Sequence, residues 1–355
     1  MAHRVLQVIT PSHMSGAETQ VVRVAKRMRE RGHQMPVLLK RHPGVRDEMR
    51  SRGIEVDTAS IGGKANLFAL AAIARVVRRH QATLTHSSLS TASWWCGWLE
   101  ALGGPRSIGH VHGFTSAAWH RRQRHLIAVS AAVRDDLVAQ GVPTDRITVL
   151  PNAVDPAEFQ PTRDPLAVRA ELGAEADTPV IGACGHLSVK KGYRELFAAI
   201  PQVLQRVPRA QFWILGQGEL RGELEAAATA GGFANRVRLL GYRRDAADLI
   251  NAFDVFCLPS HREPFGLVYV EAALLGKPVV GCRAGGACES IADGESGLLV
   301  PPFDADALAE ALLTLLDDPA FAQHMGATGR ERALDLFGWH QYEAALEAVY
   351  DRAAA

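Results

Sequence analysis

The sequence predicts an α/β fold of two domains, each built on a parallel β-sheet. The 355 residues are enough for two domains of ordinary size, each with its own core. Hydrophobic residues make up 47% and charged residues 22%, which is typical of a soluble globular protein. Short runs rich in β-branched residues alternate with helical patterns in both halves. This alternation favours parallel strands joined by right-handed helical crossovers.

Strands and helices alternate in the same way in both halves. RVLQVIT (4–10) is typical of a buried strand, and AETQVVRVAKRMRERG (17–32) of an amphipathic helix that ends at Gly32. Further strands are expected at residues 34–40, 82–87, 106–113, 125–130, 147–152, 179–187, 210–218, 237–242, 255–260 and 278–283. Residues 155–179 are rich in proline and charge, which indicates a hinge, and we place the domain boundary between residues 163 and 164. Because ligands bind beyond the carboxyl ends of parallel strands, the expected site is a cleft between the two domains.

Composition and charge exclude several other classes. The N-terminal run lacks the features of a signal peptide, and no run reaches the roughly 18 apolar residues of a membrane span. The five cysteines form no CxxC pair, so we expect reduced, buried thiols in the cytosol. Residues 1–150 hold 21 Lys+Arg against 10 Asp+Glu, a net +11, which leaves 18 against 28, or −10, for residues 151–355. The first half is therefore expected to meet an acidic partner.

A nicotinamide-dependent dehydrogenase is disfavoured by the glycine pattern. Such an enzyme needs G-x-G-x-x-G after its first strand, but the first loop, TPSHMSGAE, has a single glycine at Gly16. Gly216 and Gly218 follow an internal strand and lack the third glycine.

Two glutamates eight residues apart mark the apolar stretch HREPFGLVYVEAALLGKPVV (261–280). Glu263 precedes Pro264, which is favoured in the first turn of a helix, so the next three amides would form an anion site at a helix N-terminus. Glu271 would lie about 12 Å further along that helix. This span suits a nucleotide sugar, although two solvated helix carboxylates would give the same pattern.

The surrounding sequence resembles that of the retaining glycosyltransferases of family 4, whose signature is E-x7-E. The resemblance includes SGAE (15–18), HVHGF (110–114), LPNAVD (150–155), GHLSVKKG (185–192), LLGYRRD (239–245) and the region from Ser260 to Leu308. It implies a GT-B fold: an acceptor-side Rossmann-like domain at residues 1–163, a nucleotide-sugar domain at 164–337, and a last helix at 338–355 that crosses back. It also implies no cofactor and no metal. No DxD motif ends a strand, and DAD (304–306) is expected to cap the next helix.

The resemblance also assigns roles. Glu263 would contact the transferred sugar, Lys191 the diphosphate, and Glu271 the ribose. The backbone around sugar, phosphate and base would come from a further set: Gly16, Phe265, Gly266, Leu267, Tyr242 and Arg243. His112 would lie near the donor sugar, and Asn152 would end a strand at the same site, although it or Ser130 could instead cap a turn.

Two histidine positions leave alternatives open. His186 stands where the family has an arginine, so the diphosphate raises its pKa, or another cation such as Arg262 compensates, or activity is weak. His110 and His112 share a face of an extended strand and would suit a zinc pair. No third ligand with suitable spacing is evident, although His120 and His125 are near in sequence. Zinc is therefore disfavoured, and His110 is expected to be a core histidine that bonds to the backbone.

The sequence thus predicts a retaining, metal-independent hexosyl- or N-acetylhexosaminyl-transferase. A UDP-sugar is the preferred donor, and the acceptor is an anionic glycan, lipid-linked or lipopolysaccharide-type. A nucleotide-sugar-binding protein with weak or no transfer is the alternative. The protein is expected in the cytoplasm, where its basic half can dock peripherally on an anionic membrane, and nucleic acid is not an expected partner. Trp94, Trp95 and Trp98 would cover one helix flank, as core residues or as an aromatic lip at a membrane.

Overall fold

A computed structural model describes residues 2–11 and 16–355, and the chain divides into two compact units. The first unit comprises Met1–Ala153 and Trp339–Ala355, and the second comprises Val154–Gly338. The boundary predicted between residues 163 and 164 lies further along the chain than this change of unit. The backbone amides of Thr162 and Arg163 donate to Asp248, which attaches this segment to the second unit.

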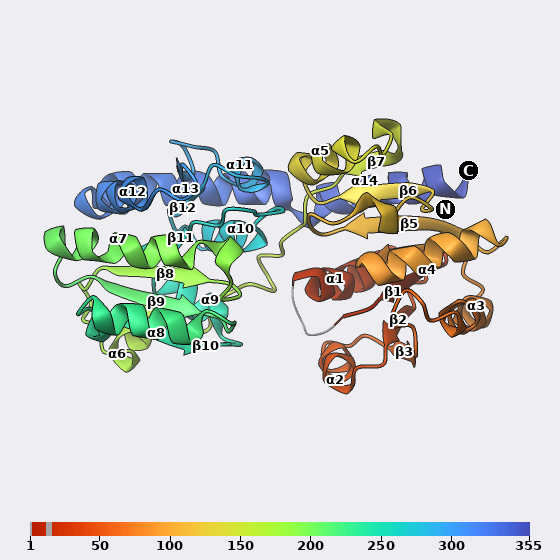
Figure 1. The fold of residues 1–355 in the computed structure, drawn as a ribbon, viewed down its shortest axis with the longest axis horizontal. Helices are drawn as coiled ribbons and strands as arrows, with labels where there is room; N and C mark the ends of the chain where they lie inside the picture. Colours follow the sequence, from red (N-terminus) through yellow and green to blue (C-terminus); the bar gives the residue numbers. More distant parts are fainter. Residues whose placement is uncertain (1, 12–15) are drawn as a thin grey trace. The chain divides into compact units, whose positions relative to one another are not determined.

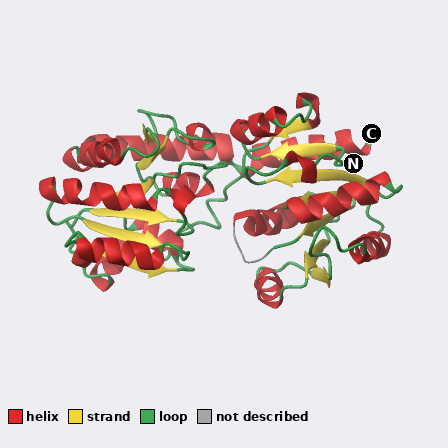
Figure 2. Ribbon diagram, viewed as in Figure 1, coloured by secondary structure: helices red, strands yellow, loops and turns green. Residues whose placement is uncertain are grey.

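The first unit contains a seven-stranded parallel sheet in the order β3-β2-β1-β4-β5-β6-β7 (Figures 1 and 2). Its strands are β1 (Val5–Ile9), β2 (Val37–Lys40), β3 (Val56–Ala59), β4 (Leu84–Ser88), β5 (Arg106–Val111), β6 (His125–Ala128) and β7 (Ile147–Val149). Its helices are α1 (Gly16–Glu30), α2 (Pro43–Ser51), α3 (Phe68–His80), α4 (Ser90–Ala101), α5 (Ala131–Ala139) and α14 (Trp339–Ala354), with short 3-10 turns η1 (Ala117–Trp119) and η2 (Thr144–Arg146).

Helices cover both faces of this sheet, because successive residues of a strand point to opposite sides. Val5 and Ile9 of β1 enter a core with residues of α1, α2 and α14. Leu6 and Val8 enter a separate core with residues of α3 and α4. A strand buried on both faces does not alternate apolar with exposed polar residues, which explains why β1 (VLQVI) is apolar except for Gln7, itself 1% exposed.

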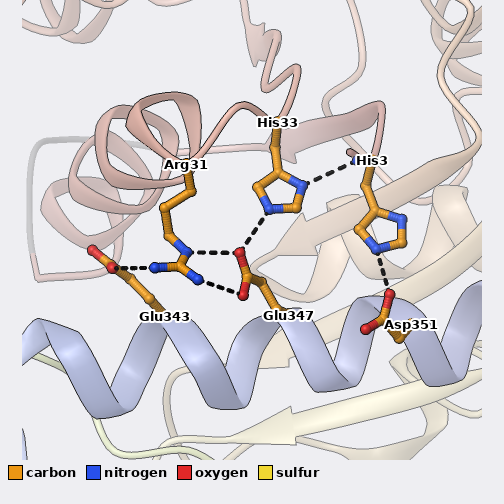
Figure 3. Close-up of polar contacts among 6 residues, drawn as sticks. All are labelled: His3, Arg31, His33, Glu343, Glu347 and Asp351. Atoms are coloured by element: carbon orange, nitrogen blue, oxygen red, sulfur yellow. Dashed lines mark hydrogen bonds and ion pairs between the residues drawn. The ribbon is translucent and has the colours of Figure 1, made fainter. Parts of the chain in front are cut away.

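The last helix, α14, is held in the first unit by an apolar face and a charged edge. Its buried side chains, which join the core of α1 and β1, are Trp339, Tyr342, Leu346, Val349, Tyr350 and Ala353. Along its edge, Arg31 donates from Nε and Nη2 to the two carboxylate oxygens of Glu347 at 2.6 and 2.7 Å (Figure 3). His33 donates to the same carboxylate at 2.9 Å, and His3 donates to Asp351 at 2.8 Å. Hydrogen bonds from Arg31 and then His33 lower the pKa of Glu347 to about 2.

The second unit contains a six-stranded parallel sheet in the order β10-β9-β8-β11-β12-β13. Its strands are β8 (Val180–Cys184), β9 (Gln211–Leu215), β10 (Val237–Gly241), β11 (Val255–Leu258), β12 (Val279–Cys282) and β13 (Gly297–Val300). Its helices are α6 (Pro165–Glu171), α7 (Tyr193–Arg206), α8 (Arg221–Ala230), α9 (Ala246–Asn251), α10 (Leu267–Leu274), α11 (Ala287–Ser290), α12 (Ala305–Asp317) and α13 (Pro319–Phe337), with the 3-10 turns η3 (Val189–Lys191) and η4 (Ala234–Arg236). Two parallel-sheet α/β domains of this kind are the fold class that the sequence predicts.

Two smaller findings concern expectations from the sequence. Asp304 does cap a helix, since its side chain accepts from the amide of Ala307 at 2.9 Å at the start of α12. Among the described residues, no helix is long and apolar enough to cross a membrane.

Candidate functional site

The strand order of the second sheet reverses between β8 and β11. From β8 the chain proceeds outward through β9 to β10, and then returns to β11 on the other side. At such a point the loops that follow the two neighbouring strands diverge, and ligands of open α/β sheets bind there. The loop after β8 carries Lys191, and the loop after β11 carries Glu263. Two of the three predicted catalytic residues therefore come from the two loops at this position.

Hydrogen bonds join these two loops to each other. The carbonyl of Lys190 accepts from the amide of His261 at 2.9 Å and from the hydroxyl of Ser260 at 3.1 Å. Gly192 has φ +73°, and a Cβ at this position would lie 1.9 Å from the carbonyl oxygen of Pro259. Only glycine meets both requirements, so Gly192 permits the close contact that sets the position of Lys191.

Lys191 and Glu263 form an ion pair. The Lys191 ammonium donates to Oε2 of Glu263 at 2.6 Å. Glu263 is only 5% exposed, and its carbonyl accepts from the amide of Gly286 at 2.7 Å. A Cβ at Gly286 would lie 2.2 Å from the carbonyl oxygen of Pro264, so the loop after β12 also packs on this backbone. A buried carboxylate that is paired and fixed from two sides is well suited to positioning a ligand.

The helix after Glu263 begins later than the sequence predicts. Pro264 does not open it, because α10 starts at Leu267 with Gly266 at its N-cap in the left-handed conformation (φ +85°). A Cβ at Gly266 would lie 2.2 Å from the ring of Tyr269, whose hydroxyl donates to the carbonyl of Leu258 at 2.6 Å. This hydrogen bond fixes the first turn of α10 against β11, so the three residues from Pro264 form the loop that leads into the helix. Glu263 and Glu271 therefore do not lie on one helix.

The remaining predicted residues around α10 have different environments. Phe265 is buried, with its ring edge-to-face against Phe337 at 5.3 Å. Leu267 is half-buried as the first residue of α10. Glu271 is half-buried on α10. Burial raises the pKa of Cys184 to about 12, and the charge of Glu271 contributes to this rise, which puts Glu271 near the end of β8.

The loops after β8 and β10 carry the other predicted donor residues. His186 is exposed, and its Nε2 lies 3.2 Å from a carboxylate oxygen of Glu219. Tyr242 is 58% exposed. Arg243 donates from Nε and Nη2 to Asp245 at 2.7 and 2.6 Å, and this hydrogen bonding raises the pKa of the guanidinium.

Gly216 and Gly218 have a packing role. A Cβ at Gly216 would lie 1.9 Å from the carbonyl oxygen of Gly185, and one at Gly218 would lie 2.3 Å from that of Leu187. The two glycines let the loop after β9 lie directly on the loop that contains His186.

In the first unit, His112 belongs to a group of histidines at the ends of β4 and β5. Its Nε2 lies 3.1 Å from the hydroxyl of Ser88, and its ring stacks on that of His110 at 4.1 Å. The ring of His110 in turn stacks on His86 at 5.3 Å. Burial lowers the pKa of His112 and of His86 to about 4 and about 3, so both rings are neutral at pH 7.

Hydrogen bonds settle the tautomers in this group. The amide nitrogen of Gln7 and the hydroxyl of Tyr350 lie 3.2 and 2.8 Å from Nδ1 of His86. An amide nitrogen can only donate, so Nδ1 of His86 accepts and its proton is on Nε2. That Nε2 donates to Nδ1 of His110 at 3.2 Å, which leaves the proton of His110 on its own Nε2. Within the described structure this buried N–H has no hydrogen-bond partner.

The other predicted residues of the first unit are less informative. Gly16 is the exposed first residue of α1, while Ser15 of the SGAE motif lies outside the described residues. Asn152 is 9% exposed, and its Oδ1 has no partner among the described residues. Ser130 caps α5 by accepting from the amide of Val133 at 3.0 Å, which is the alternative that the sequence left open.

The histidines do not gather in the manner of a metal site. Within residues 2–11 and 16–355, no group of three or more His, Cys, Asp or Glu side chains is arranged to hold a metal ion. His120 is buried with both ring nitrogens unpartnered in the described structure, and burial lowers its pKa to about 4.

Three residues of these sites were missed in the sequence. His86 and Ser88 end a strand that was predicted, but nothing in its pattern distinguished their side chains from core residues. Gly286 follows a predicted strand as the second residue of a Gly-Gly pair, which is a signal of close backbone approach that was available.

Comparisons with known proteins identify the family and the fold. Residues 178–318 match the family model described as glycosyl transferases group 1, and residues 14–158 match that of glycosyltransferase family 4. The chain is 36% identical over 303 residues to a D-inositol 3-phosphate glycosyltransferase of Kineococcus radiotolerans, covering 78% of this chain and 68% of that protein. It is 37% identical over 202 residues to a GDP-mannose-dependent phosphatidylinositol monomannoside mannosyltransferase of Corynebacterium glutamicum, covering 54% and 52%. The crystal structure of Anabaena HepE in complex with UDP and glucose superposes with a TM-score of 0.89 at 24% identity, covering 98% of this chain and all of that one.

Proposed function

Because the chain belongs to the family 4 glycosyltransferases, with two α/β domains of the GT-B type, we propose that it transfers a hexosyl or N-acetylhexosaminyl group with retention from a UDP-sugar. The acceptor is a glycan, lipid-linked or lipopolysaccharide-type molecule. The proposed reaction needs no metal ion.

The ion pair between Lys191 and Glu263 carries this proposal. A diphosphate needs a cation, and a sugar needs a hydrogen-bond acceptor for its hydroxyls. Both groups meet here at 2.6 Å, at the point of the sheet where α/β proteins bind nucleotides. In the proposed complex Lys191 contacts the diphosphate and Glu263 the sugar, with the amides from Phe265 to Leu267 beside them. Glu271 binds the ribose, and the backbone at Tyr242 and Arg243 contacts the base.

The proposed chemistry is a substitution on one face of the sugar. The acceptor hydroxyl attacks the anomeric carbon from the side on which the diphosphate leaves, and the departing phosphate oxygen takes the hydroxyl proton. Lys191 stabilises the charge that develops on the leaving group. Glu263 orients the sugar, and His112, which is neutral at pH 7, contributes a hydrogen bond to it. Gly16, Asn152 and His186 complete the proposed contacts to the donor.

Uracil is favoured as the base over guanine by the likeness to HepE, which was solved with UDP and glucose. The Corynebacterium relative uses GDP-mannose, so the base must be tested directly. Isothermal titration of UDP, GDP and ADP in the presence of EDTA is the decisive measurement. We expect UDP to bind most tightly and its affinity to be unchanged by EDTA.

Transfer itself is tested by incubating the protein with the preferred donor and a panel of glycan and lipid-linked acceptors. NMR of the product gives the anomeric configuration, which should match that of the donor. UDP binding with neither transfer nor donor hydrolysis across the panel would instead support a nucleotide-sugar-binding protein.

A further inference from the structure

One face of the first unit carries a row of tryptophan rings between two cations. The ring centroids of Trp98 and Trp94 are 5.9 Å apart, and those of Trp94 and Trp119 are 5.7 Å apart, both edge-to-face. The Arg122 guanidinium lies 3.7 Å from the ring centroid of Trp98, and the Lys64 ammonium lies 3.3 Å from that of Trp119. We call these five residues the tryptophan row. All three rings are only half-buried, whereas neighbouring Trp95 is 2% exposed and belongs to the core.

Two large apolar side chains project into solvent just after Lys64. Leu67 is 74% exposed and Phe68 is 85% exposed. The loop before them is well attached: the indole N–H groups of Trp94 and Trp95 donate to the carbonyls of Lys64 and Gly63 at 3.2 and 2.9 Å. The loop therefore holds Leu67 and Phe68 outward, next to the tryptophan row.

Phe68 cannot turn into the core without a rotation of α3. The inner face of this helix buries Ala69, Ile73 and Val76 against the sheet. Phe68 begins the opposite face, on which Arg75 and Arg78 are also exposed. Helix α3 lies beside α4, which carries two of the three rings (Figure 1). The outer surface is thus apolar at the start of α3 and basic at its end.

The charge of this region is strongly one-sided. Between Asp57 and Asp135 the sequence has nine lysines and arginines, namely Lys64, Arg75, Arg78, Arg79, Arg106, Arg121, Arg122, Arg124 and Arg134. The single acid in that interval is Glu100, whose carboxylate already accepts from the amide and the hydroxyl of Ser107 at 2.8 and 2.6 Å. A partner of opposite charge is therefore favoured.

We propose that this face, formed by the tryptophan row with Leu67 and Phe68, docks on the surface of a bilayer that contains anionic lipid. Indole rings favour the headgroup region, exposed leucine and phenylalanine insert below it, and lysines and arginines bind acidic headgroups. A nucleic acid or an acidic glycan would satisfy the cations but would leave Leu67 and Phe68 in water. Docking would bring the protein to a lipid-linked acceptor, so the proposal rests on the proposed function for its biological purpose. The binding itself is argued from the side chains of this face.

Vesicle sedimentation tests the proposal directly. The full chain is mixed with phosphatidylcholine vesicles with or without phosphatidylglycerol, at low and moderate salt. We expect binding to the acidic vesicles only, weaker at moderate salt. The double variant Leu67→Ser with Phe68→Ser should lower the partition coefficient about tenfold or more. Leu166→Ser, which changes a 53% exposed leucine at the start of a helix in the second unit, is the matched control and should bind as the unsubstituted protein does.

Three results would overturn docking: no binding to acidic vesicles at low salt, equal binding by the double variant, or equal loss in Leu166→Ser. Heparin binding is a further test. If the protein binds heparin as tightly as acidic vesicles, and the double variant binds heparin equally well, the face is a polyanion site and the docking proposal is wrong. UDP titration of the double variant separates the two proposals. If the double variant loses vesicle binding but keeps its UDP affinity, the substitution has affected docking alone. If neither the unsubstituted protein nor any variant binds UDP, the transferase assignment is wrong, whatever the vesicle result.

Discussion

Lys191 and Glu263 are each other's partners, at 2.6 Å, across two loops that start from neighbouring strands. A diphosphate that binds the ammonium must therefore compete with a carboxylate that is 5% exposed. Substitutions of the two residues should therefore have opposite effects on donor binding, because Lys191 attracts the diphosphate and Glu263 repels it.

Lys191→Ala should weaken UDP binding about tenfold or more, since a hydrogen bond between charged groups contributes about 1.5–3 kcal/mol. Lys190→Ala is the matched control, because it removes an exposed lysine from the same turn. Isothermal titration of both variants is the measurement. Equal UDP affinity in the two variants would show that Lys191 does not bind the diphosphate.

Glu263→Gln should lower the transfer rate about tenfold or more, equivalent to about 1.4 kcal/mol in the barrier, while UDP affinity stays equal or rises. Glutamine keeps the size of the side chain but removes the charge that competes for Lys191. Alanine is a poorer choice than glutamine, because it would leave Lys191 beside an empty space in a buried site. Parallel loss of transfer and UDP affinity would contradict the proposed division of roles.

His186→Arg should tighten UDP binding, because a guanidinium is always charged and offers two fixed donors to a diphosphate. Glu219 adds a structural reason, since its carboxylate lies 3.2 Å from the imidazole and competes with a phosphate. Glu219→Gln in the unsubstituted background should therefore also tighten binding. Isothermal titration of UDP into both variants is the measurement, and unchanged affinities would place His186 away from the diphosphate.

The buried histidines of the first unit should make its stability fall in mild acid. The pKa is about 3 for His86 and about 4 for His112 and His120, against 6.5 for an ordinary histidine. Below about pH 6.5 the unfolded chain takes up these protons and the folded unit does not. Stability is therefore fully present above that pH and falls toward pH 4, by up to about 1.4 kcal/mol per pH unit for each histidine.

Urea unfolding at pH 7 and pH 5, followed by tryptophan fluorescence, measures this loss. Five of the six tryptophans belong to the first unit. His120→Leu should make the free energy of unfolding depend less on pH. It removes no hydrogen bond, because neither ring nitrogen has a partner in the described structure. His324→Leu, at an exposed position of α13, should leave the dependence unchanged. The carboxylate of Glu347 does not interfere, since its contribution is lost only below about pH 4.5, as the pH approaches 2.

Strands such as β9 (QFWIL) and β11 (VFCL) were predictable because apolar residues dominate their sequences. The two strands that were missed each have a physical reason. β3 (VDTA) is a half-exposed edge strand of four residues with polar side chains, and β13 (GLLV) is a four-residue edge strand that begins with glycine. The predicted hinge at 155–179 contains α6, which Asp164 caps by accepting from the amide of Leu166. Charge and proline suggested a linker there, but they also suit the first turn of a short helix.

The candidate site was predictable only where chemistry and motif agreed. Glu263 and Lys191 were chosen from separate segments, and nothing in either spacing predicted that they would bind each other. That contact depends on the order of the strands in the sheet, which a single sequence does not specify. The late start of α10 was hidden for a related reason, because the hydrogen bond from Tyr269 to Leu258 is a tertiary contact.

The attachment of α14 to the first unit has a consequence during synthesis. A ribosome makes residues 1–153 first, at about 5–20 residues per second, but their core lacks Tyr342, Leu346 and Tyr350 until the whole second unit has been made. The second unit is continuous in sequence, so all of its residues have been made before α14. During synthesis the first unit therefore exposes the apolar face that α14 later covers. A chain truncated before residue 339 should aggregate or bind chaperones, although its second unit is whole.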